Sequence, residues 1–217
     1  MARRVDIHAR GGAFARACGL VAALYAIAAG LPATSPAAVD VGHVPGVFGE
    51  PAVAARFWRE QHTSDCAELA VADVVGEITG REPSEQDVTT MAETTPSVSG
   101  TGSIWQPWGF TDIQDVPILL GHYGITAENM RTDIDGLKRM LGTGRRIIAH
   151  VNAETLWNRP AHREIADHFV VVTGIDTWTG MVHLNDSAIA TGRNEVVPIA
   201  VFEQAWATNR RAATITR

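Results

Sequence analysis

Cysteine and lysine are scarce in this chain of 217 residues, which has two cysteines and a single lysine, Lys138. Charged residues make up only 19% of the chain and hydrophobic residues 46%, so the composition excludes a chain that is disordered throughout. No stripe of basic residues is interleaved with aromatic ones, which excludes the usual pattern of a nucleic-acid binder. With a net charge of −6, we expect a folded acidic protein that binds no nucleic acid.

Several cofactor motifs are also missing from the sequence. There is no phosphate-binding loop and no dinucleotide fingerprint, so nothing indicates a nucleotide or another cofactor. Zinc ligands can be imagined among His150, His162, His168, His183 and Asp186, but the helical HExxH spacing is absent, and the segment HREIADH does not match it. We therefore expect neither a metal nor a cofactor.

The N-terminal apolar run is too short for an ordinary membrane-spanning helix. It covers 14 residues at 18–31 (CGLVAALYAIAAGL), whereas a spanning helix needs about 20. Four arginines precede it and small residues with prolines follow, which is the layout of a secretory signal peptide. We predict a signal peptide at 1–38 and a secreted or cell-envelope protein. The alternative is an uncleaved membrane anchor.

Removal of the leader leaves a chain with one cysteine. Cys18 lies within the predicted signal, so Cys66 is the only cysteine of the mature protein. The loss of four arginines and one aspartate also moves the net charge from −6 to −9. Because secreted proteins usually pair their cysteines, a lone one indicates an intermolecular bridge or a free reactive thiol.

The hydrophobic pattern changes from helical to alternating along the chain. Residues 39–52 resemble a linker punctuated by Gly and Pro, and 53–217 form the predicted domain. Helices are expected first, with caps and glycine stops, at 65–79, 84–93, 112–123 and 133–141. Strands follow at 147–152, 168–175, 181–185, 196–199 and 212–216, with a short helix at 201–207. Helices followed by an antiparallel sheet predict an α+β fold.

Cys66 falls at the predicted start of the first helix. The helix dipole and free backbone N–H groups at that position stabilise a thiolate. Gln61, five residues earlier, could supply a side-chain donor that joins the Cys66 N–H group in stabilising an oxyanion, as acyl transfer requires. The alternative is a small buried cysteine beside an unrelated surface glutamine.

His168 opens the strongest predicted strand and could act as the base of the thiol. The hairpin turn near 177–180 returns the chain, so Asp186 should lie close to the start of the His168 strand. A carboxylate there would orient the imidazole. Asn185 is an alternative third member. Taken singly, His168 could also be a core histidine and Asp186 a turn residue at a strand end.

These segments together resemble cysteine-peptidase family thirty-nine. The resemblance is carried by DCAELAVADVVGEITG and HFVVVTGIDTWTGMVHLNDS and covers roughly 55–210. It implies a papain-like cysteine peptidase fold with Cys66 as nucleophile, His168 as base, Asp186 as orienting acid and Gln61 in the oxyanion hole. Where the family often has Gly after the Cys and Pro after the Asp, this chain has Ala67 and Ser187.

The resemblance implies a secreted cysteine peptidase or related amide hydrolase, with a peptide or protein as its substrate partner. Exporter-fused members cut after double glycine, and we do not carry that specificity over. A second hypothesis is a cell-wall endopeptidase of the NlpC type, because DCxxL also fits that group, although its histidine usually follows the cysteine more closely than the 102 residues seen here. A third is a papain-like module that binds without turnover. Trp105, Trp108 and Phe110 either line a substrate cleft or pack in the core.

Overall fold

The computed structural model of the protein describes residues 46–217. The predicted signal peptide at 1–38 and the first part of the predicted linker lie outside the described residues. Within 46–217, no helix combines the length and the apolar character needed to cross a membrane. The domain bounds stay predictions. In the latter part of the expected linker, residues 47–49 form a strand and a helical turn begins at Pro51.

The strands of the described residues form one antiparallel sheet. Its order is β2-β7-β3-β4-β5-β6, and β1 pairs with β4 beside this path. β4 is central: residues 168–172 pair with β3 and residues 174–176 pair with β1. The strand bounds are β1 Val47–Gly49, β2 Ala127–Arg131, β3 Ile147–Val151, β4 His168–Asp176, β5 Met181–Asn185, β6 Glu195–Pro198 and β7 Ala212–Thr216.

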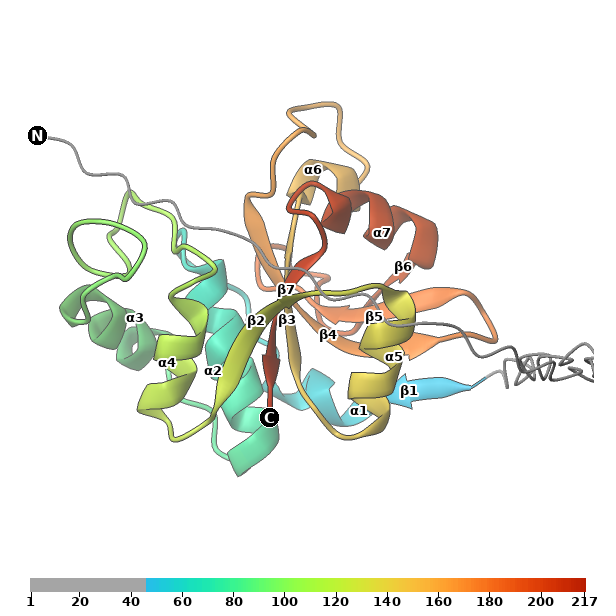
Figure 1. Ribbon diagram of the computed structural model, residues 1–217, viewed down its shortest axis with the longest axis horizontal. Coiled ribbons are helices and arrows are strands. Elements are labelled where there is room, and N and C mark those ends of the chain that lie inside the picture. The colour runs from blue at the N-terminus through green and yellow to red at the C-terminus, as the bar shows by residue number, and fades with distance from the viewer. Residues whose placement is uncertain (1–45) are drawn as a thin grey trace, which may run out of the picture. The chain divides into compact units, whose positions relative to one another are not determined.

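The helices cover both faces of this sheet (Figure 1). Helices α2, α3 and α4 lie together on one side, whereas α5 and α7 lie on the other. Their bounds, with those of the short turns, are α1 Pro51–Ala54, η1 Ala55–Phe57, α2 Cys66–Thr79, α3 Glu85–Thr94, α4 Val116–His122, α5 Ile134–Gly142, α6 Ala153–Leu156 and α7 Ile199–Ala207. The expected α+β papain-like fold is therefore correct.

Alternation along β4 divides the core in two. Phe169 and Val171 pack with α2 and α4, while Val170 and Val172 pack with the cluster that contains Leu137 of α5 and neighbouring residues of α7. Successive side chains of a strand point to opposite faces, so one buried strand joins both halves of the core. His168 is the first residue of this strand and is consequently held by a rigid element.

Helix α2 is buried over most of its length, from Ala67 to Gly76. A helix that is apolar nearly all round fits between other elements rather than on a surface, and α2 packs against β4 as well as α3 and α4. It ends at Gly80, which takes a left-handed conformation with φ of 75° and donates its N–H group to Gly76. This packing fixes the N-terminal residue, Cys66, against the sheet.

The elements predicted from periodicity are confirmed with bounds that shift by a few residues, and Ser84 and Asp87 form a capping box at the start of α3. The structure adds five elements that the sequence analysis did not predict: β1, α1, η1, β2 and α6. The view that the first half is purely helical is thus wrong at Ala127–Arg131. This strand pairs with the last strand of the chain, and its partly exposed side chains show no clear alternation between buried and exposed positions.

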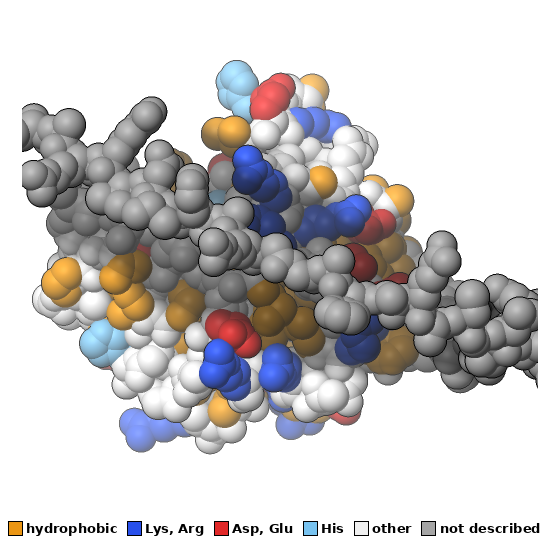
Figure 2. All heavy atoms as spheres, viewed as in Figure 1, with side chains coloured by type: hydrophobic (Ala, Val, Ile, Leu, Met, Phe, Trp, Pro, Cys, Tyr) orange, Lys and Arg blue, Asp and Glu red, His pale blue; other side chains and the backbone are white. Residues whose placement is uncertain are grey.

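The surface mixes side-chain types. Where described residues are visible on the face in Figure 2, Lys and Arg side chains are interspersed with Asp, Glu and apolar ones. The most exposed large apolar side chains of residues 46–217 include Trp108, Phe110, Ile165 and Trp178. Two of these, Trp108 and Phe110, belong to the loop between α3 and α4.

Candidate active site

Cys66 is the first residue of α2, and its thiol is free and half-buried. The preceding residue, Asp65, is the N-cap, but its side chain makes no capping hydrogen bond. The backbone N–H groups of the first helical turn therefore have no side-chain cap from Asp65. The sequence prediction that Cys66 stands at a helix N-terminus is confirmed.

His168 lies between Cys66 and Asp186. Its Nε2 atom is 2.8 Å from Oδ1 of Asp186, and the ring interacts electrostatically with the Cys66 thiol. Since Nε2 faces the carboxylate, Nδ1 is the ring nitrogen left for the thiol. Burial opposes the imidazolium charge, but the hydrogen bonds with Asp186 and Cys66 outweigh burial and raise the pKa of His168 to about 10. The ring can therefore hold a proton at neutral pH.

The Asp186 carboxylate accepts three hydrogen bonds while fully buried. Its Oδ1 atom accepts from His168 and from the backbone N–H of Ala188 at 2.9 Å. Its Oδ2 atom accepts from the indole Nε1 of Trp157 at 2.9 Å. Burial acts against the charge, yet the bond from His168 and the other donors lower the pKa of Asp186 below its ordinary value. The carboxylate thus stays ionised next to the imidazole.

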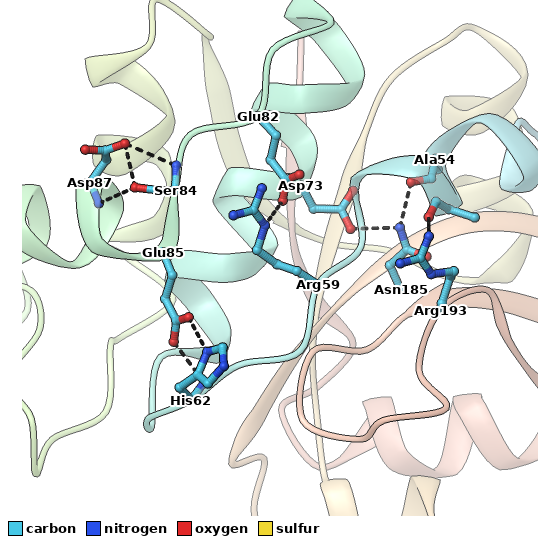
Figure 3. A network of polar contacts seen from close by, with 11 residues as sticks. Ala54, Arg59, His62, Asp73, Glu82, Ser84, Glu85, Asp87, Asn185 and Arg193 are labelled. Atoms are coloured by element: carbon cyan, nitrogen blue, oxygen red, sulfur yellow. Dashed lines mark hydrogen bonds and ion pairs between the residues drawn. The ribbon is translucent and has the colours of Figure 1, made fainter.

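Asn185, the alternative third member, is engaged elsewhere. Its amide nitrogen donates to the carbonyl of Ala54 at 2.9 Å and to Oδ2 of Asp73 at 2.7 Å. Figure 3 shows this amide directed at both partners. Its carbonyl oxygen accepts from the backbone N–H of Asn194. The residue that meets His168 is therefore Asp186, and Asn185 ties the end of β5 to α1 and α2.

Gln61 lies in the segment that leads to α2 and is tied to the residue after Asp186. Its backbone N–H donates to the carbonyl of Ser187 at 2.8 Å, and its side-chain oxygen accepts from the Ser187 hydroxyl at 2.8 Å. The side-chain nitrogen donates to the carbonyl of Thr63 at 2.8 Å. Both ends of the Gln61 amide are therefore hydrogen-bonded, the nitrogen within the segment that leads to α2 and the oxygen to the residue after Asp186.

Two tryptophans support the site and were not singled out from the sequence. Trp157 packs against His168 with ring centroids 5.3 Å apart, besides its bond to Asp186. Trp58 donates from Nε1 to the backbone carbonyl of Asp186 at 2.6 Å. Both lie far from Asp186 in sequence, so no local spacing indicated them. An indole N–H needs an acceptor when it is buried, and this was the only available signal.

The aromatic residues of the loop between α3 and α4 differ in exposure: one packs in the core and two face solvent. Trp105 is buried and donates from Nε1 to the carbonyl of Ser64 at 2.9 Å, which fastens the loop to the segment just before Cys66. Trp108 and Phe110 are 83% and 77% exposed. Phe110 also lines an open pocket of about 340 Å³. Trp105 is therefore a core residue, while the other two are available to a ligand.

Asp65, the residue just before Cys66, lies near the carboxylate of Glu85 at the start of α3. Burial and the neighbouring carboxylate of Glu85 raise the pKa of Asp65 to about 6. Glu85 accepts from the backbone N–H of His62 at 2.8 Å and lies 2.6 Å from Nδ1 of its ring, as Figure 3 shows. These contacts hold the loop between Gln61 and Cys66 against α3.

The combination of a thiol, an imidazole that can be protonated and a buried carboxylate is the equipment of nucleophilic acyl transfer. Comparison with known proteins also indicates a peptidase. The sequence model of the Peptidase_C39 like family matches residues 53–214.

The chain belongs to this family.

Relatives and solved structures agree with that membership. The uncharacterized protein Rv1268c of Mycobacterium tuberculosis is 40% identical over 222 residues, covering 89% of this chain and 94% of the relative. The uncharacterized protein Mb1299c of Mycobacterium bovis gives the same values. Among solved structures, a protein described as a C39-like peptidase from Bacillus anthracis has a TM-score of 0.57 at 16% identity, over 74% of this chain and 93% of that one. The peptidase domain of Streptococcus ComA has a TM-score of 0.51 at 14% identity, over 73% and 96%. These likenesses show a C39-like peptidase fold.

Proposed function

We propose that the protein is a secreted cysteine peptidase in which Cys66, His168 and Asp186 act as a catalytic triad. The observation that carries this proposal is the buried His168 imidazole, whose Nε2 lies 2.8 Å from Asp186 Oδ1 and whose ring interacts with the Cys66 thiol. Family membership supports a peptidase, and hence a peptide or protein substrate. The basic leader and short apolar run support an extracytoplasmic location.

The first half-reaction follows from the orientation of the imidazole. The Cys66 thiolate attacks the carbonyl carbon of the scissile amide, and the carbonyl oxygen becomes an oxyanion. The backbone N–H of Cys66 and the Gln61 amide stabilise this charge. His168 then gives its proton to the leaving nitrogen as the C–N bond breaks, leaving a thioester and a free amine.

The second half-reaction regenerates the thiol. A water molecule attacks the thioester while His168 takes one of its protons. The C–S bond breaks, the carboxylic acid leaves, and the thiolate and imidazolium are restored. Asp186 does not exchange a proton in this scheme. It holds the ring so that Nδ1 faces the thiol, and it stabilises the imidazolium.

The experiment is a comparison of turnover in three variants. A peptide library screened with the full chain supplies a cleavable peptide, and its turnover is then measured for Cys66→Ser, His168→Ala and the double variant. Members of one catalytic unit are not additive, so the double variant should be no slower than either single one. Asn185→Ala is a control that disturbs the same hairpin without touching the imidazole.

Three results would contradict the proposal. Turnover by Cys66→Ser near that of the unaltered protein would mean that the nucleophile is elsewhere. A folded protein that cleaves no peptide of the library, and whose thiol reacts no faster than a free cysteine, would be a papain-like binding module. Cleavage confined to peptidoglycan stem peptides would favour the cell-wall endopeptidase instead.

A further inference from the structure

Ser187 connects the two halves of the proposed catalytic apparatus. It follows Asp186 directly and is 7% exposed. Its hydroxyl donates to Oε1 of Gln61 at 2.8 Å, and its carbonyl accepts from the Gln61 backbone N–H at 2.8 Å. Two consecutive residues therefore hold the base and the glutamine: Asp186 contacts His168, and Ser187 contacts Gln61.

The Gln61 amide is hydrogen-bonded at both ends, and the Thr63 carbonyl fits only one of its two orientations. The Thr63 carbonyl can only accept a hydrogen bond, so it requires the NH₂ group, which it receives at 2.8 Å. The Ser187 hydroxyl donates to the oxygen on the other end. Rotation of the amide by 180° would bring its oxygen against the Thr63 carbonyl and place two acceptors together.

This orientation leaves one N–H of the amide without a partner among residues 46–217. An oxyanion needs a donor that is already aimed at it, because a donor that must first reorient loses much of its stabilising effect. In the flipped orientation, the Gln61 oxygen would replace this N–H and repel a developing negative charge. The hydroxyl of Ser187 therefore bears on the reaction by restraining the oxygen end of this amide, although within residues 46–217 Ser187 makes no hydrogen bond to the thiol or the imidazole.

We propose that Ser187 is a positioning residue that, together with the Thr63 carbonyl, holds the Gln61 amide with its N–H toward the oxyanion. The inference rests on the proposed function, since it requires that Gln61 is the side-chain donor of the oxyanion hole. The hydroxyl also marks a departure from the family pattern noted above, because a proline at this position has no hydroxyl to donate.

Ser187→Ala removes the hydroxyl and keeps the backbone bond to Gln61. We expect the turnover number to fall about 5- to 10-fold, the factor that one neutral hydrogen bond contributes. This is less than the about 10²- to 10³-fold loss expected for Gln61→Ala, which removes the donor itself. KM and the rate of thiol alkylation by iodoacetamide should not change, because neither involves an oxyanion. Ser187→Thr keeps the hydroxyl and should restore most of the turnover.

A matched control is available on the far strands of the sheet. The hydroxyl of Thr214 donates to the amide oxygen of Asn129 at 2.5 Å, and the amide nitrogen of Asn129 donates to the carbonyl of Ile113 at 2.8 Å. This amide is held in the same way but lies outside the proposed site. Thr214→Val removes that hydroxyl at constant shape, and we expect it to lower stability while leaving the turnover number unchanged.

The deciding experiment is a double-mutant cycle measured with the full chain on a fluorogenic peptide taken from the library. If Ser187 acts through Gln61, then Ser187→Ala should slow the unaltered protein but have no further effect on Gln61→Ala. Circular dichroism and urea unfolding establish that each variant is folded.

The outcomes separate this inference from the proposed function. If Gln61→Ala is slow and Ser187→Ala is either fully active or equally harmful in both backgrounds, the inference is wrong and the triad stands. If Gln61→Ala is as fast as the unaltered protein while Cys66→Ser is inactive, the oxyanion assignment and the inference both fail. Activity of Cys66→Ser would overturn the proposed function itself.

Discussion

The three donors on Asp186 explain why an acid, and not an amide, stands at this position. Asp186→Asn can keep Oδ1 for His168 and Ala188, but its NH₂ group then replaces Oδ2 and faces the indole N–H of Trp157. Two donors then meet with no acceptor between them. Trp157→Phe removes that indole N–H, so its effect should depend on which residue is at 186.

The size of the effect follows from the contacts. With Asp186 present, Trp157→Phe breaks a hydrogen bond to a charged group, and the free energy of unfolding should fall by roughly 1.5–3 kcal/mol. With Asn at 186, the same change removes a donor–donor contact and should raise stability by about 1 kcal/mol, the low end for an unsatisfied buried donor. The lost packing of Arg159 on the indole ring is common to both backgrounds and cancels in the cycle.

The assay is urea unfolding at neutral pH, followed by circular dichroism, for the unaltered protein, both single variants and the double variant. The pKa of His168 is raised from 6.5 to about 10, so its stabilising contribution is complete below pH 6.5 and is lost as the pH rises through 10. Neutral pH therefore retains most of the imidazolium–carboxylate pair. Equal destabilisation by Trp157→Phe in both backgrounds would refute the proposed role of Oδ2.

Three further predictions follow from other parts of the molecule. Burial raises the pKa of Glu68 from 4.5 to about 7, so the protein loses stability as the pH rises from 4.5 through 7. Glu68→Gln keeps the acceptor for Thr111 and carries no charge, so between about pH 4 and about pH 8 its free energy of unfolding should rise by about 3 kcal/mol relative to that of the unaltered protein. Urea unfolding at both pH values measures this change, and a difference that does not vary with pH would contradict it. Asn185→Ala should lower the free energy of unfolding by about 1–3 kcal/mol, because it strips a donor from buried Asp73, with no change in thiol alkylation; slower alkylation would give Asn185 a role in the site. N-terminal sequencing of secreted protein should begin between Leu31 and Gly42, and an intact Met1 on cytosolic protein would contradict the leader prediction.

Local sequence signals were enough to predict most elements and the chain order of the site. Cys66 at a helix start and His168 at the head of a Val-rich strand follow from periodicity and glycine punctuation. The proximity of Asp186 to His168 follows from the short hairpin between β4 and β5, because a tight turn fixes which residues face each other.

Contacts between distant segments could not be predicted in this way. β2 forms only because β7, about 85 residues later, supplies its partner strand. Likewise, the bonds of Trp157 to Asp186 and of Ser187 to Gln61 depend on how loops meet after folding. The sequence favoured Asp186 with Asn185 as the alternative, and two contacts that form only on folding separate them: His168 with Asp186, and Asp73 with Asn185.

The rate at which iodoacetamide alkylates Cys66 at neutral pH, measured for the unaltered chain and for His168→Ala, tests the central claim most directly. If the imidazole activates the thiol, the unaltered protein should react fast and His168→Ala at least about 10-fold more slowly, because the thiolate is the reacting species. Cys66 is the only cysteine within residues 46–217, so mass spectrometry of the labelled peptide assigns the reaction to it. Equal rates in the two folded proteins would contradict a catalytic pair of Cys66 and His168.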